Sequence, residues 1–115
     1  DPSEDPVNLT YVAKDLTWLR RCRNGDAIDL HCLRLGEARV LFMPGELTIP
    51  YQLAAQSMRP GKFVAMAAYG DYAPGYICAK SQYGQGGYED SPRASKVAPE
   101  VEDVLLPAMQ TLLTR

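Results

Sequence analysis

The stretch Leu41-Phe42-Met43-Pro44-Gly45-Glu46 decides the fold. Its apolar residues predict a buried strand that stops at Pro44-Gly45 and delivers a carboxylate, Glu46, to the start of a predicted helix. A second apolar run, residues 63–69, ends in a long Tyr- and Gly-containing connection that reaches Tyr88. Ligands of open α/β sheets bind beyond the carboxyl ends of the strands, so we expect a functional site within residues 41–88.

The rest of the chain predicts a small α/β fold around these two strands. Helical spacing of apolar residues indicates helices at residues 12–24, 49–58 and 98–113, the last containing Pro107, which should kink it. Alternation indicates strands near residues 28–32 and 39–43, joined by a two-residue turn at Gly36-Glu37. The run 63–69 is apolar on both faces, which favours an interior parallel strand reached by a crossover.

These elements give a three-stranded sheet, a hairpin plus a βαβ crossover, with about three helices. We expect residues 1–115 to form a single α/β unit. Because a three-stranded sheet is thin, this unit is expected to be a fragment of a larger α/β sheet.

Composition excludes several function classes. The 115 residues are 46% hydrophobic and 23% charged, with a formal net charge of −2, which is typical of one globular domain and gives no sign of a nucleic-acid partner. The basic cluster Arg20-Arg21-Arg23 falls at a predicted helix end, where cations complement the helix dipole; a phosphate-binding patch is the alternative. No apolar run is long enough to span a bilayer, which takes about 20 residues. The 3 cysteines lack metal-type spacing and leave the cellular compartment open.

Glu46 is the first candidate for chemistry. A carboxylate at a helix start meets free backbone N–H groups and stays ionised, which suits metal ligation or electrostatic stabilisation. The alternative is that Glu46 only caps its helix.

The tyrosines between Tyr69 and Tyr88 are the second candidate, because phenols can ligate a cation, donate to an oxyanion or line a pocket. Packing at the surface is the alternative. Asp71 is either a site acid or a turn residue. His31, the sole histidine, cannot complete a two-histidine metal centre or a Ser-His-Asp triad. The segment 84–87 is glycine-rich but lacks the pattern of a phosphate-binding loop.

Several short motifs together resemble one enzyme family. They are Pro44-Gly45-Glu46, the Tyr-Gln-Leu-Ala run at residues 51–54, the Tyr-Gly-Asp-Tyr run at residues 69–72, and the spacing of Tyr76, Tyr83 and Tyr88-Glu89. This combination is similar to the later part of the catalytic domain of neutral/alkaline non-lysosomal ceramidases, especially the shorter bacterial type. In that family a zinc ion is held by two histidines, a glutamate and a tyrosine, and a serine attacks the amide of ceramide.

The resemblance implies a role for particular residues of this chain. Glu46 and Tyr83 match the glutamate and tyrosine ligands of zinc, and Asp71, Tyr72, Tyr76 and Tyr88 would line the substrate pocket. Ser95 stands where the family has a further, oxyanion-binding tyrosine. The nucleophile and the histidine ligands match no residue here, so we assign no catalytic residue, and we expect the chain alone to be inactive and not to retain zinc.

Two functions follow as expectations. The first is part of a zinc-dependent amidohydrolase that cleaves an N-acyl amide such as ceramide to a sphingoid base and a fatty acid, with the upstream part of the same domain as its partner. The family resemblance is compatible with secretion or a periplasmic location. The second is a non-catalytic α/β binding or assembly module whose Tyr/Gly loop is a contact surface.

Overall fold

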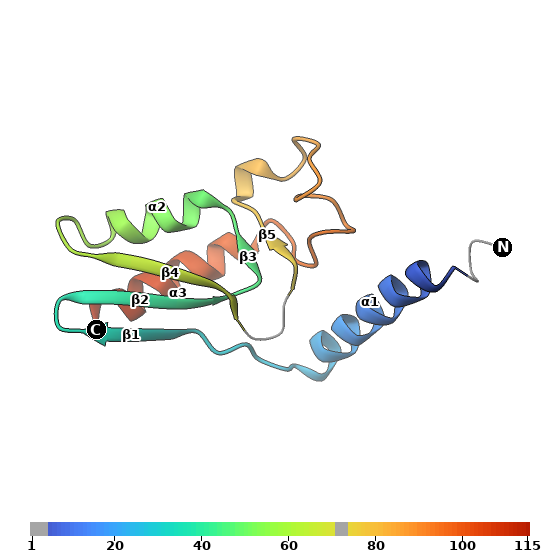
Figure 1. Ribbon diagram of the computed structural model, residues 1–115, viewed down its shortest axis with the longest axis horizontal. Coiled ribbons are helices and arrows are strands. Elements are labelled where there is room, and N and C mark those ends of the chain that lie inside the picture. The colour runs from blue at the N-terminus through green and yellow to red at the C-terminus, as the bar shows by residue number, and fades with distance from the viewer. Residues whose placement is uncertain (1–4, 71–73) are drawn as a thin grey trace.

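The computed structural model describes residues 5–70 and 74–115. Its elements run along the chain in the order shown in Figure 1: α1 (Pro6–Asn24), β1 (His31–Leu35), β2 (Ala38–Pro44), β3 (Glu46–Leu47), α2 (Ile49–Ser57), β4 (Val64–Gly70), β5 (Tyr76–Ile77), the short 3-10 helix η2 (Lys80–Gln82) and α3 (Val101–Thr114).

A three-stranded mixed sheet in the order β1-β2-β4 is the centre of the fold. β1 and β2 are antiparallel and joined by the predicted turn, in which Gly36 has a φ of 57°. β2 and β4 are parallel, with α2 in the connection between them. The predicted α/β class, with its hairpin and βαβ unit, is therefore confirmed. A small parallel pair, β3 with β5, was not predicted.

Two predictions about the strands are wrong. β2 is the central strand, whereas β4, expected in the interior, is outermost. The sequence of β4 is apolar on both faces largely because it contains alanines. Their small side chains expose little apolar surface, so this strand can lie at the edge of the sheet. The first strand spans residues 31–35 instead of 28–32, because the two-residue turn pairs Leu35 with Ala38 and the ladder extends back from there.

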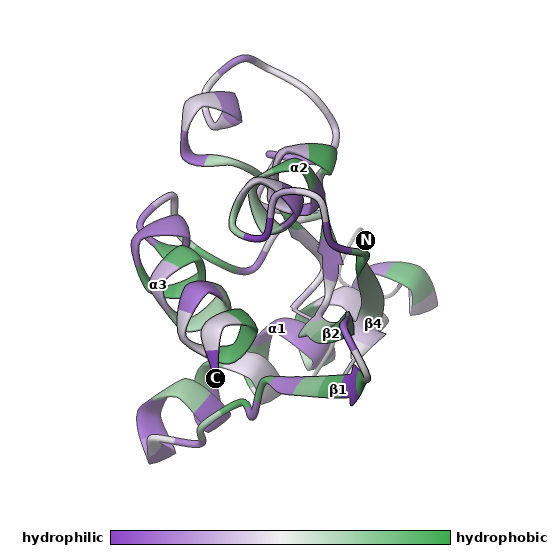
Figure 2. Cartoon of the chain, turned by 90° about the vertical axis from the view of Figure 1, so that its left-hand side faces the viewer, coloured by the Kyte–Doolittle hydropathy of each residue, from purple (hydrophilic) through white to green (hydrophobic). Residues whose placement is uncertain are grey.

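The core lies between the sheet and two helices. α2 contacts β4, α3 contacts β1 and β2, and the two helices contact each other, so both cover the same face of the sheet (Figure 2). The buried cluster draws on all of these layers and consists of Leu41, Met43, Tyr51, Ala55, Val64, Ile77, Leu105, Met109 and Leu113. The alternate residues Leu33, Leu35 and Phe42 are exposed on the other face.

α3 confirms the clearest helical pattern in the sequence. It buries Leu105, Met109 and Leu113 along one face and includes Pro107 in its interior. Among residues 5–70 and 74–115, no helix combines the length and the hydrophobicity needed to cross a bilayer.

α1 projects from this body as a separate rod (Figure 1). It begins at Pro6, six residues earlier than predicted, because the Asp5 carboxylate caps it by accepting the Val7 N–H at 3.0 Å. It ends as predicted, with Gly25 as the left-handed C-cap. No residue of α1 is buried, and Val12 remains 62% exposed. An ion pair of 2.7 Å between Asp15 and Lys96 connects the helix to the body.

Candidate functional site

Glu46 stands at a junction of four chain segments. β2 ends at Pro44, Gly45 turns the chain with a φ of 63°, and Glu46 begins β3. The Glu46 N–H donates to the Gly75 carbonyl at 2.9 Å, and the Tyr69 N–H donates to the Gly45 carbonyl at 2.6 Å. The backbone thus fixes the carboxylate beside the end of β4 and the start of β5.

The glycines of this junction permit its close backbone packing. A Cβ on Gly45 would lie 2.5 Å from the Gly75 carbonyl oxygen, and a Cβ on Gly75 would overlap the Ala94 carbonyl oxygen. Both glycines also have positive φ. Only glycine satisfies both demands without strain.

Glu46 does not start a helix, so the expected helix start at Glu46 and the capping alternative are both wrong. The N-cap of α2 is Thr48, and Glu46 pairs with Tyr76 in the β3-β5 ladder. Residues 46–47 pair with β5 and are therefore strand residues, so α2 begins only at Ile49.

Two tyrosine hydroxyls flank the Glu46 carboxylate. A hydrogen bond that Tyr69 donates to Glu46 raises the pKa of the Tyr69 phenol, and the negative charge of Glu46 raises the pKa of Tyr76. Both effects have the same cause, because a carboxylate disfavours a second negative charge beside it. These phenols therefore stay protonated as hydrogen-bond donors at neutral pH.

Tyr69 also has an unusual backbone conformation. Its φ of 62° is the one positive value at a non-glycine position among the described residues. Such a conformation is uncommon for a bulky side chain and often marks a functional site. Sequence reasoning named Tyr69 only within the tyrosine-rich segment and gave it no site role, although its position at the end of a strand, directly before Gly70, was an available signal.

The other predicted pocket residues divide into two groups. The Tyr88 ring packs edge-on against Tyr76, with ring centroids 6.0 Å apart, so the structure joins these two to Glu46. Asp71 and Tyr72 lie outside the described residues.

A cavity of about 550 Å³ opens beside Glu46. Its acidic lining residues are Glu46, Glu89 and Asp90, its apolar ones include Leu47, Ile49 and Pro50, and neither Lys nor Arg lines it. The Asp90 carboxylate accepts N–H bonds from Gly84, Gly86 and Gly87, and these bonds, that from Gly87 foremost, lower the pKa of Asp90. Asp90 therefore orders the glycine-rich turn as an anion.

Tyr83 has partners of its own, separate from those of Glu46. Its hydroxyl accepts the Cys78 N–H at 3.3 Å and lies 3.1 Å from the Oγ atom of the buried Ser95. Ser95 is the position where the ceramidase resemblance expects a further tyrosine. The structure thus gives the two expected zinc ligands different surroundings: Glu46 lies in β3 beside Tyr76, whereas Tyr83 follows η2, bonds to Cys78 and Ser95, and does not line the cavity beside Glu46.

The donor set in the described ranges does not complete a zinc shell. No group of three or more His, Cys, Asp or Glu side chains there is arranged to hold a metal ion. Structural and catalytic zinc sites normally draw at least three ligands from the protein. Residues 5–70 and 74–115 therefore do not supply three such ligands to one centre.

Comparisons with known proteins add no assignment. A scan of protein-family models and searches of curated proteins and of solved structures found no match to this chain.

Proposed function

We propose that this chain is part of a zinc-dependent amidohydrolase of the ceramidase-like kind, which cleaves an N-acyl amide. In this proposal Glu46 and Tyr83 are oxygen ligands of the zinc ion, and Tyr76 and Tyr88 form part of the pocket wall together with Asp71 and Tyr72. The observation that carries the proposal is Glu46 at the start of β3, where a backbone hydrogen bond holds the main chain and the carboxylate lines a cavity without cationic lining.

The cavity has a chemistry that suits such a substrate. Its carboxylates attract a cation, whereas Leu47, Ile49 and Pro50 offer an apolar surface to an acyl chain. The hydroxyl protons of Tyr69 and Tyr76 are directed to Glu46, so their oxygens can accept a hydrogen bond from the amide N–H of a substrate. A zinc ion, when bound, would polarise the amide carbonyl.

The remaining ligands and the nucleophile are proposed to come from other segments of the complete domain. His31 begins β1 opposite Phe42, on the exposed face of the sheet, and is not part of the Glu46 cluster. Tyr83 would have to exchange its bonds with Cys78 and Ser95 for a bond to the metal.

The test uses the complete domain that this proposal requires, with zinc content and hydrolysis of an N-acyl amide as readouts. We expect Glu46→Gln and Tyr83→Phe each to lower both, by about 10- to 100-fold or more, since altering even the outer partners of a metal site has effects of this size. Glu37→Gln is the matched control, because Glu37 is an exposed carboxylate paired with Lys62 at the hairpin. Unchanged zinc content and hydrolysis in both site variants would sink the proposal.

The isolated 115-residue chain gives a second test. We expect it neither to hydrolyse N-acyl lipids nor to retain zinc, because the described residues lack a complete shell. Turnover by this chain alone would contradict the proposed division of the site.

A specific observation favours the second candidate, an assembly module. The sheet face opposite α2 and α3 exposes Leu33, Leu35 and Phe42, although apolar side chains are normally covered when they cluster. Its test is the mass of the chain in solution: Phe42→Ser should reduce self-association if this face is used, and a concentration-independent monomer would exclude self-assembly.

A further inference from the structure

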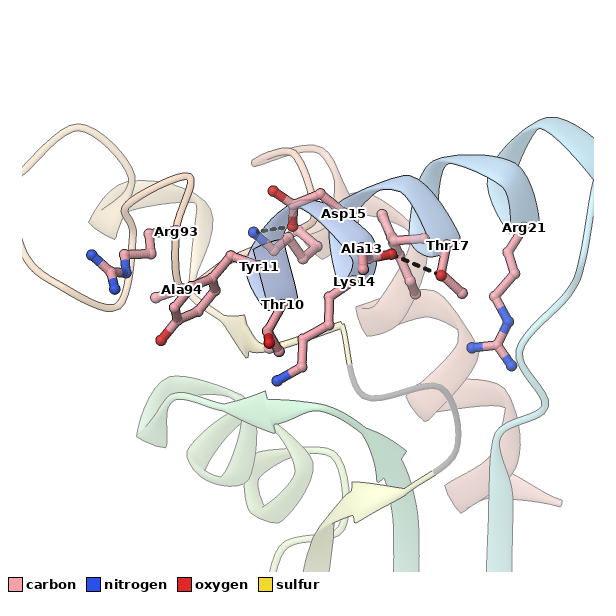
Figure 3. Close-up of a pocket in the computed structure, with 12 residues that line it drawn as sticks. Thr10, Tyr11, Ala13, Lys14, Asp15, Thr17, Arg21, Arg93 and Ala94 are labelled. Carbon is pink, nitrogen blue, oxygen red and sulfur yellow. Dashed lines mark hydrogen bonds and ion pairs between the residues drawn. The ribbon is translucent and has the colours of Figure 1, made fainter. Parts of the chain in front are cut away.

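A second cavity lies away from Glu46, between α1 and residues 93–96. Its volume is about 630 Å³, which is in the range of small-molecule sites. Tyr11, Lys14, Trp18 and Arg21 line it from one side of α1, because residues spaced by three or four share a helix face. Figure 3 shows Tyr11, Lys14 and Arg21 extending from the same side of the helix. Arg93, Ala94 and Lys96 line it from the body.

Positive charge converges on one aromatic ring in this cavity. The Arg93 guanidinium carbon lies 4.5 Å from the centroid of the Tyr11 ring, and the Lys14 Nζ atom lies 5.9 Å from it. A hydrogen bond and the charge of Arg93, with smaller contributions from Lys14 and Lys96, lower the pKa of Tyr11. Two cationic side chains from different parts of the chain are thus gathered at one ring, where an anion could contact both.

The negative charge of the lining is too small to balance these cations. Asp15 is the one acidic residue among those that line the cavity in the described part of the chain, and it pairs with Lys96 at 2.7 Å. Arg93 and Lys14 both act on Tyr11, which is neutral when protonated. The cavity therefore has a surplus of positive charge next to the rings of Tyr11 and Trp18.

We propose that this cavity binds a small organic dianion of the phosphate-monoester class, with its phosphate between Lys14 and Arg93 and its body against Trp18. Guanidinium and ammonium groups are the usual phosphate partners, and together they match a charge of about −2. Threonine hydroxyls of the lining, Thr10 and Thr17, donate to carbonyls of α1. Charge therefore dominates the recognition. The inference does not depend on the amidohydrolase proposal.

The sole tryptophan is a built-in reporter, because Trp18 lines the cavity. The test titrates the 115-residue chain with phenyl phosphate at low salt and follows the Trp18 fluorescence. We expect a saturable change that weakens as salt is added, because salt screens charge pairs near the surface. Benzylamine, a cation of similar size, should give no saturable change.

Variants locate the binding. Lys14→Gln should weaken phenyl phosphate by about tenfold, the loss expected for one charge-assisted hydrogen bond. Arg93→Gln should do the same and Arg93→Lys should largely restore binding. Arg20→Gln is the matched control on the same helix, outside the lining, and should change affinity by less than about twofold.

A structural effect can be separated from a binding effect. Lys14 contacts Tyr11 within α1, so its replacement leaves the Arg93–Tyr11 and Asp15–Lys96 contacts between α1 and the body in place. Circular dichroism of each variant without ligand checks that the helix is intact. The absence of a saturable response to phenyl phosphate, an equal loss in Arg20→Gln, or equal binding of benzylamine would overturn the proposal.

Discussion

At the scale of single residues, the Glu46 carboxylate and the phenols of Tyr69 and Tyr76 form one electrostatic unit. Glu46 is the largest cause of the raised pKa of each phenol. Both tyrosines are fixed near it by backbone geometry, Tyr76 through the β3-β5 ladder and Tyr69 through its positive φ. The unit therefore depends on charge and on local backbone structure together.

This unit predicts a dependence of stability on alkaline pH. A folded-state pKa above the unfolded value means that the unfolded chain ionises first. The stability associated with protonated Tyr69 and Tyr76 is thus fully present below pH about 10 and is lost as the pH rises above it. Glu46→Gln should lower the pH at which these phenols ionise, measured by the ultraviolet absorbance of phenolate, and should flatten the alkaline decline in the free energy of unfolding.

Glu37→Gln is the control, since Glu37 pairs with Lys62 at the far end of the hairpin. It should leave the tyrosine titration unchanged. The same titration curve for Glu46→Gln and the unaltered chain would show that Glu46 does not act on these phenols.

At the scale of elements, the junction of β2 and β3 with β5 depends on glycine. Gly45→Ala should lower the free energy of unfolding in urea by about 3 kcal/mol or more, from about 1–2 kcal/mol for a left-handed non-glycine residue plus the clash with the Gly75 carbonyl. The matched control is Gly61→Ala. Gly61 also has a positive φ, of 75°, but a Cβ there meets nothing within 4 Å, so only the first contribution applies. Equal losses in the two variants would contradict the packing described at Gly45.

Local patterns in the sequence predicted most of the elements. The two-residue turn at Gly36-Glu37, the end of α1 at Asn24, and the helices α2 and α3 depend on periodicity and turn chemistry within a few residues. The β3-β5 pair could not be predicted in this way. Two-residue strands have no periodicity, and their pairing joins residues 30 positions apart, Glu46 with Tyr76.

The candidate site was predictable only in part, because some of its residues belong to local sequence patterns and others do not. Glu46 was selected because it follows a strand end, and Tyr76 and Tyr88 because they lie in the tyrosine-rich connection and match the family resemblance; the structure brings the three together. Tyr69 joins the cluster through a positive φ, which its place in an apolar strand run did not indicate. The basic cavity was also missed, because the arginines near the end of α1 were interpreted as complements of the helix dipole, and Arg93 lies far along the chain.

At the scale of the whole molecule, whose greatest extent is 56 Å, α1 and α3 differ in how much of each is buried. α1 buries no residue, whereas α3 buries Leu105, Met109 and Leu113. Exposed ion pairs contribute only about 0–1 kcal/mol, so the Asp15–Lys96 pair holds α1 weakly.

Native-state hydrogen exchange should reveal this difference. We expect α1 amides to exchange at least about tenfold faster than those of α3, because local opening of α1 exposes little apolar surface. α3 is an internal control, as a helix of the same chain measured in the same sample. Equal protection of the two helices would mean that α1 packs more firmly than its contacts indicate.

The outermost position of β4 also affects how the chain aggregates. Within the described chain, the sheet order leaves the far side of this strand without a neighbour, and its sequence, Val-Ala-Met-Ala-Ala-Tyr-Gly, has no charge to deter one. The Gln52 amide donates to the Val64 carbonyl and so blocks only its first residue. Unpaired peptide groups on an edge strand can pair with a strand of another molecule. At high protein concentration the chain should therefore polymerise through β4. It should not polymerise through β1, because the charge of Arg34 opposes pairing there.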